Sequence, residues 1–206
     1  MSEPTPDVVR AYYAALCADY GATVVPKASS ALMGAVGAFL GAIGIVDRAA
    51  FASRFVTTLG RTVYVPFVPG EPSADWSLWS QIEVLAHECQ HIRQHDDRGL
   101  RFERDYLMST AKRAHLEAEA YAVNAALHHW RHGVIEGWWP THTAGLLRFY
   151  GCTDADVLVA ERHLRMIAGS VRAGVVVSHA ARTAIVWLDE HAPKLRHPAV
   201  ASRARS

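Results

Sequence analysis

The pattern that most restricts the fold of this chain is a long amphipathic helix over residues 76–95. Its apolar residues recur at the spacing of a helix surface, and they are Trp76, Trp79, Ile82, Val84, Leu85, Cys89 and Ile92. A polar turn, residues 96–99, follows the helix. Because such a helix has to bury its apolar face against other elements, we expect a globular domain built around it.

The segments on either side predict a mixed but mainly helical fold. Apolar spacing indicates further helices over 7–20, 47–60, 101–131, 141–150, 154–168 and 170–190. Residues 61–67 have the β-branched and aromatic composition of a short strand, and Pro66 marks its edge or its end. Gly133 is a helix stop signal, and residues 138–140 predict a loop. The expected class is α+β, predominantly helical, with a small β-sheet.

Length and composition fit one domain with a decorated end. The chain has 206 residues, of which half are hydrophobic, so it can bury a core without disulfide bonds. We expect a single domain over residues 1–190. Residues 191–206 contain prolines and several Arg and Lys, and we expect them to form a flexible basic tail.

The charge balance and the cysteines exclude some functions. Lys and Arg number 21 against 20 Asp and Glu, a net charge of +1, which gives no electrostatic reason to bind a nucleic-acid backbone. Cys17, Cys89 and Cys152 are widely spaced and predict no disulfide framework. The N-terminus lacks the basic and apolar regions of a signal peptide. These features predict a cytoplasmic protein with no nucleic-acid partner.

One long segment has no charged residue at all. It covers residues 28–46, between Lys27 and Asp47, and carries four regularly spaced glycines, at positions 34, 37, 41 and 44. We favour a buried, glycine-rich core element. The alternative is a helix in or on a membrane, because the segment reaches the lower length limit for a span and the glycines form a smooth face.

The residues that carry chemistry lie on the 76–95 helix. His87, Glu88 and His91 belong to an HExxH sequence, in a chain with 12 histidines. Residues four apart lie on one helix face, so both imidazoles can reach one metal ion. Glu88 follows the first histidine and can reach a water bound to that ion.

A zinc site of this kind needs a third protein ligand. A histidine six residues after His91 is excluded because position 97 is Asp97, and His95 is turned about 80° from His87 around the helix. The next helix offers Glu117 and Glu119. They are two residues apart and lie on opposite faces, so only one of them can point at the ion.

The combination of HExxH with a glutamate on a following helix resembles the gluzincin zinc metallopeptidases. The string from Glu117 to Ala122 resembles the ExxA pattern of their ligand helix, with Ala120 as the small residue. Residues 59–66 resemble the edge strand that precedes their active-site helix. The resemblance, which covers about residues 57–126, implies a zincin-like domain in which Glu117 is the third zinc ligand. Many gluzincins have an aspartate where this chain has Tyr121, so support for a ligand histidine is expected from Tyr121 or from Asp105.

The resemblance implies a zinc-dependent peptidase. His87, His91 and Glu117 would hold Zn²⁺, Glu88 would be the general base, and the strand around residues 63–66 would pair with a peptide or protein substrate. Tyr106, Tyr121 and several histidines (His115, His128, His129 and His132) are further candidates for polarising the substrate carbonyl. Cys89 is expected in the core, and Gln94 on a solvated face. The alternatives are a metal-binding structural or interaction module without turnover, and a membrane-associated zinc protease using residues 28–46.

Overall fold

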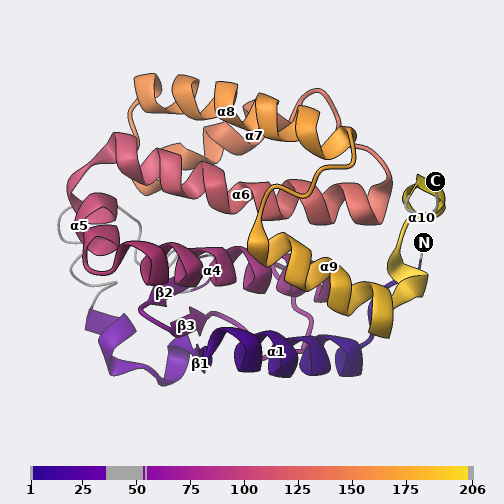
Figure 1. Ribbon diagram of the computed structural model, residues 1–206. Helices are drawn as coiled ribbons and strands as arrows, with labels where there is room; N and C mark the ends of the chain where they lie inside the picture. Colours follow the sequence, from indigo (N-terminus) through magenta and orange to yellow (C-terminus); the bar gives the residue numbers. More distant parts are fainter. Residues whose placement is uncertain (1, 36–52, 54, 204–206) are drawn as a thin grey trace.

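The computed structural model describes residues 2–35, 53 and 55–203, and shows a mainly helical chain with one small sheet (Figure 1). This confirms the expected α+β class. The helices of these residues are α1 (Pro6–Tyr20), α4 (Leu78–Arg98), α5 (Arg101–Met108), α6 (Thr110–His132), α7 (Trp139–Leu146), α8 (Asp154–Arg172), α9 (His179–His191) and α10 (Pro198–Arg203). Short 3-10 helices are η1 (Lys27–Ser29), η2 (Leu147–Tyr150) and η3 (Pro193–Leu195).

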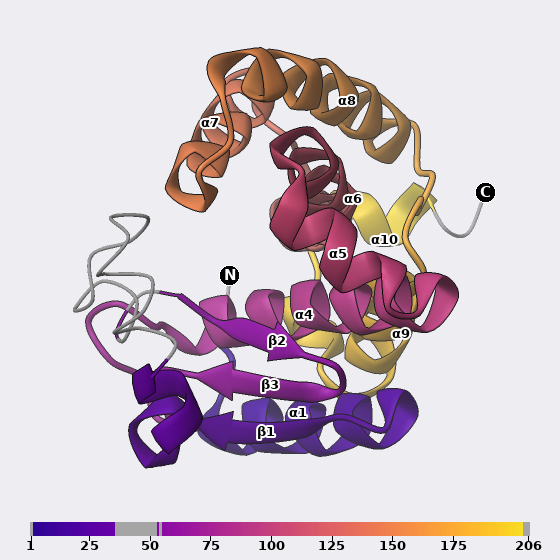
Figure 2. The same cartoon turned by 90° about the vertical axis from the view of Figure 1, so that its left-hand side faces the viewer.

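The sheet has three strands in the order β1-β3-β2 (Figure 2). β1 (Thr23–Pro26) is parallel to β3 (Thr62–Val65), and β2 (Thr57–Leu59) is antiparallel to β3. The helix expected over 47–60 is therefore wrong at its C-terminal end. Two β-branched threonines lead into a tight turn where Gly60 takes a positive φ of 57°, and the turn lets residues 57–59 pair with β3.

Helix α4 is the centre of the packing, as its apolar pattern predicts. It contacts α1, α5, α6, α9 and β2, and its buried apolar residues include Ile82, Leu85 and Ile92. α6 lies against α4 on one side and against α8 on the other, so α8 and α7 form an outer layer (Figure 1). The two helices that carry the candidate ligands therefore pack directly on each other.

Three helix boundaries differ from the sequence predictions. The helix expected over 101–131 is divided at Ser109, whose φ of −140° is extended and whose hydroxyl caps α6. α7 begins at Trp139, inside the expected loop, with Pro140 in its first turn. The helix expected over 170–190 begins only at His179, because Gly174 has a positive φ of 86° and a non-helical stretch follows it.

The C-terminal segment expected as a flexible tail lies partly against the body of the protein. Leu195 in η3 is buried, and the backbone N–H of His197 donates to the carbonyl of Trp130 at 3.0 Å. Arg196 forms an ion pair with Asp189 at 3.3 Å. An apolar residue and a backbone hydrogen bond hold this stretch, neither of which its basic composition indicates.

The uncharged segment over 28–46 lies mostly outside the described residues. Its first residues belong to η1, and residues 31–35 are helical. Of the helices that the structure describes, none has the length and apolarity required to cross a membrane. Residues 36–46 lie outside the described residues, so the core and membrane interpretations of this stretch both stay predictions.

Candidate metal centre

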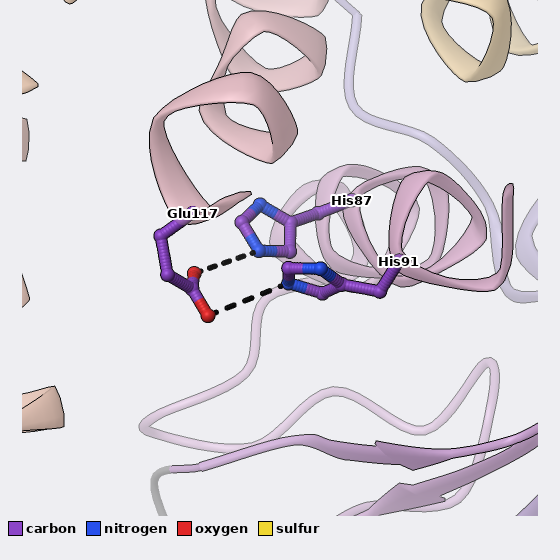
Figure 3. Close-up of side chains that lie close together, drawn as sticks. All are labelled: His87, His91 and Glu117. Carbon is purple, nitrogen blue, oxygen red and sulfur yellow. Dashed lines mark ion pairs between the residues drawn. The ribbon is translucent and has the colours of Figure 1, made fainter. Parts of the chain in front are cut away.

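The structure brings His87, His91 and Glu117 together between α4 and α6 (Figure 3). His87 Nε2 lies 3.5 Å from Glu117 Oε2, and His91 Nε2 lies 3.5 Å from Glu117 Oε1. Within the described part of the chain, they form the only group of three or more His, Cys, Asp or Glu residues whose ligand atoms all lie within 4.8 Å of one another. The group could hold a metal ion.

Both His–Glu distances are of the length expected between two ligands of one zinc ion, and they end on different oxygens of Glu117. Zinc–ligand bonds of about 2.1 Å at the tetrahedral angle place neighbouring ligand atoms about 3.4 Å apart, close to the 3.5 Å observed for both His–Glu pairs. Glu117 is 1% exposed, and its Oε2 has no hydrogen-bond partner. A buried carboxylate oxygen without a partner is costly, and a cation between the three side chains would satisfy it.

The charges of the group favour a cation in the same place. Burial alone would lower the pKa of His91, but the charge of Glu117 and a hydrogen bond to it outweigh burial and raise that pKa to about 9. Burial would likewise raise the pKa of Glu117, yet His91 and His87 hold it well below its ordinary value. A proton is therefore bound tightly where a metal ion would compete with it.

Each ligand side chain has a further polar partner. His87 Nδ1 is 2.8 Å from Asn124 Oδ1, and His91 Nδ1 is 2.8 Å from Gln94 Oε1. The Tyr106 hydroxyl donates to Glu117 Oε1 at 2.5 Å. Burial raises the pKa of Tyr106 well above its ordinary value, so its hydroxyl keeps the proton that it donates.

These partners correct two predictions. Asp105 does not support a ligand histidine, because it pairs with Lys112 at 2.8 Å and with Arg104 at 3.0 Å. Gln94 is not on a solvated face but is buried. Tyr121 lies beside His87 with ring centroids 4.9 Å apart, and contributes a ring contact there. Asn124 could have been found from the sequence, since it lies seven residues after Glu117 on the same face of α6.

Arg113 holds the segment that carries Tyr106. Its guanidinium donates to the carbonyls of Tyr106 at 2.7 Å, Leu107 at 3.0 Å and Tyr150 at 2.6 Å, and it also lies over the Tyr106 ring. The end of α5 and the end of η2 are thereby fixed to α6. This contact places the Tyr106 hydroxyl at Glu117.

Glu88 lies beside the three-residue group without belonging to it. It is buried, and its Oε2 accepts a hydrogen bond from the Thr58 hydroxyl at 2.6 Å. Thr58 is on β2, the outer strand of the described sheet next to α4. Sequence patterns do not point to Thr58, because they predict a helix for its segment.

The remaining candidates lie elsewhere. Glu119 contacts Gln94, Arg98 and His115 and not the two ligand histidines. His95 pairs with Glu103 at 2.6 Å, and His128 pairs with Glu136 at 3.0 Å. Cys89 is fully buried, as expected, and burial raises the pKa of its thiol.

The site is enclosed. The side chains of His87 and His91 are 8% exposed, and the rings of Tyr106 and Phe102 lie about 6.1 Å from that of His91. A cavity of about 550 Å³ is lined mainly by residues of α4, α6 and α8, which include Gln94 and Glu119. The three ligand side chains do not line it.

Comparison with protein-family models, with curated proteins and with solved structures finds no match for this chain.

Proposed function

We propose that the protein is a zinc-dependent peptidase whose zinc ligands are His87, His91 and Glu117. The observation that carries the proposal is that these three side chains meet, with one ligand atom of each within 4.8 Å of the others, beside the carboxylate of Glu88. Two imidazoles and one carboxylate form a known ligand set of catalytic zinc, with a fourth position left for water. Zinc bound there would lower the pKa of that water to about 7 and polarise a substrate carbonyl.

Glu88 supplies the general base. The Thr58 hydroxyl donates to its Oε2 at 2.6 Å and orients the carboxylate, which would accept the water proton. The same carboxyl group can then deliver that proton to the leaving amine. Because Glu88 adjoins His87 on α4, the base and the two histidine ligands are held by one helix, and Glu117 is held by α6.

The outer strand β2 is the candidate site for an extended peptide. Substrate pairing was expected at residues 63–66, but β3 is the central strand and already pairs with β1 and β2. β2 is an edge strand of the described sheet and carries Thr58, whose hydroxyl donates to Glu88. A peptide added along β2 would run past the general base, with main-chain hydrogen bonds supplying its affinity.

The test compares wild type with Glu88→Gln, using Glu136→Gln as the matched control. We expect one zinc per chain in all three proteins by elemental analysis. Hydrolysis of an unfolded protein substrate should fall at least 100-fold in Glu88→Gln and be unchanged in Glu136→Gln. Equal hydrolysis by wild type and Glu88→Gln would remove Glu88 as the base, and no zinc in wild type would remove the whole proposal.

The enclosure of the site favours one second candidate, a zinc-stabilised structural or interaction module without turnover. Glu117 is 1% exposed and both histidine side chains 8% exposed, which suits a closed structural metal. In that case the wild type binds one zinc and loses thermal stability with a chelator, but cleaves no substrate under any condition in which zinc is retained.

A further inference from the structure

Each of the three ligand side chains is held by a neutral partner. The imidazoles of His87 and His91 face the side-chain amides of Asn124 and Gln94, and the carboxylate of Glu117 accepts from Tyr106. Metal-bound histidines commonly donate instead to a carboxylate, which raises the basicity of the ring and strengthens metal binding. A carboxylate joins this network beyond Gln94, because Glu119 Oε2 accepts a hydrogen bond from Gln94 Nε2 at 2.9 Å.

The orientation of Gln94 follows from its own hydrogen bonds. Gln94 Nε2 donates to the carbonyl of Leu116 and to Glu119 Oε2, both at 2.9 Å. Since both of these atoms are acceptors, the amide nitrogen has to face them, and Oε1 has to face His91. His91 Nδ1 therefore carries a hydrogen, which leaves Nε2 as the nitrogen that faces Glu117 and would bind the metal.

The same neutral contacts strengthen the histidines as electron donors less than carboxylate partners would. An amide oxygen draws less on an imidazole N–H than a carboxylate does, so the ring nitrogen facing the metal stays less basic. The Tyr106 hydroxyl also draws charge from Glu117 Oε1 through its 2.5 Å hydrogen bond. The same residues therefore orient the ligands towards the metal and leave them weaker donors than carboxylate partners would.

We propose that Asn124 and Gln94 are positioning residues that aim both imidazoles at the metal while, being neutral, they keep its affinity below the value that carboxylate partners would give. The proposal rests on the zinc site of the proposed function but not on hydrolysis. It makes the centre one that exchanges its metal more readily than a centre of the same ligands backed by acids.

The experiment measures zinc affinity of the full-length protein by competition with a chromogenic chelator at one fixed pH. Asn124→Ala should weaken binding 10- to 100-fold, the range found for outer partners of zinc ligands. Asn124→Asp, which keeps the shape and adds the charge, should tighten binding about 10-fold relative to wild type. A merely structural role would weaken both variants.

Gln90→Glu is the matched control. It makes the same amide-to-carboxylate change on α4, but Gln90 faces Ser178, whose hydroxyl donates to it at 2.8 Å. We expect its zinc affinity within about threefold of wild type, as for a screened surface charge. Affinity in Asn124→Asp that is equal to or weaker than wild type, or matched by Gln90→Glu, overturns the proposal, as does a wild type that binds no zinc.

A second variant, Gln94→Leu, keeps the test decisive if Asn124 variants fold poorly. It removes both the acceptor for His91 and the contacts to Leu116 and Glu119, and should weaken zinc binding 10- to 100-fold. Unchanged affinity in Gln94→Leu contradicts the positioning role. Tighter binding in Asn124→Asp without any hydrolysis by wild type supports this inference and removes the peptidase activity alone.

Discussion

Two regions of the molecule each contain two histidines four residues apart and a nearby glutamate, but the side chains are arranged differently. On α4, His87 and His91 are four residues apart and meet Glu117. On α6, His128 and His132 have the same spacing and lie near Glu136. Among the described residues, His128, His132 and Glu136 do not form a group that could hold a metal ion.

The difference lies in what the carboxylate already contacts. The side chain of Glu136 is 35% exposed and is paired with His128 at 3.0 Å, whereas Glu117 is buried between two histidines at 3.5 Å and its Oε2 has no hydrogen bond. The histidines respond in opposite directions. The pKa of His132 is lowered by burial and by the positive charges of its neighbours, while that of His91 is raised to about 9. Spacing alone therefore does not make a metal centre, and a buried carboxylate shared by both rings is also needed.

The largest expected effect separates the two glutamates directly. Glu117→Gln removes the charge but keeps the size, and should lower zinc affinity more than 100-fold, beyond the range for outer partners. Glu136→Gln should leave zinc affinity unchanged. Isothermal titration with zinc measures both, and similar losses in the two variants would contradict the assignment of the centre to Glu117.

A third carboxylate sharpens the comparison, because Glu83 lies on α4 one turn before His87 and has no histidine to share a proton with. Burial raises its pKa to about 7, and Trp79 and Arg131 offset only part of this. Between its ordinary value of 4.5 and about 7 the folded state binds the proton more tightly, so stability falls as pH rises through this window.

Glu83→Gln should therefore raise the free energy of unfolding at pH 8 by about 1–2 kcal/mol, a value reduced for the partial exposure of the side chain. At pH 4 the variant and wild type should agree, because Glu83 is then protonated. Urea unfolding at both pH values, with a chelator present, measures this, and Glu190→Gln controls for the loss of an exposed charge. A wild-type advantage at pH 8 would contradict the burial argument.

The smallest effect is expected at the second histidine pair. His132→Ala should change the free energy of unfolding by less than about 0.5 kcal/mol and leave the zinc content unchanged, since the side chain is only partly buried and belongs to no metal group. Thermal unfolding with and without zinc checks both statements. A reduced zinc content would mean that the α6 pair also binds metal.

The sequence predicts the centre well where helical spacing alone decides. His87 and His91 follow from their four-residue spacing, whereas helix geometry says only that one of Glu117 and Glu119 can face the ion, and the choice of Glu117 follows from the resemblance to the ExxA pattern. The structure confirms that Glu117 meets the two histidines. Ala120 of the ExxA pattern is fully buried, and its role in helix approach stays a prediction.

What the sequence does not predict depends on contacts between distant segments. Thr58 reaches Glu88 only because 57–59 pairs with β3, and such pairing is decided by partners rather than by local periodicity. Tyr106 reaches Glu117 only because the helix expected over 101–131 breaks at Ser109, which redirects α5. The buried state of Gln94 depends on α6, since its donors are satisfied there.

Because Arg113 donates to three carbonyls from distant parts of the sequence, the surroundings of the centre are completed in the order in which the chain is synthesised. Two of those carbonyls, from Tyr106 and Leu107, precede Arg113, but the third belongs to Tyr150, beyond α6 and α7. During synthesis from the N-terminus, both histidines and Glu117 are made before this contact can form. The segment that presents the Tyr106 hydroxyl is fully anchored only after Tyr150 has left the ribosome, so the ligands exist before their surroundings are complete.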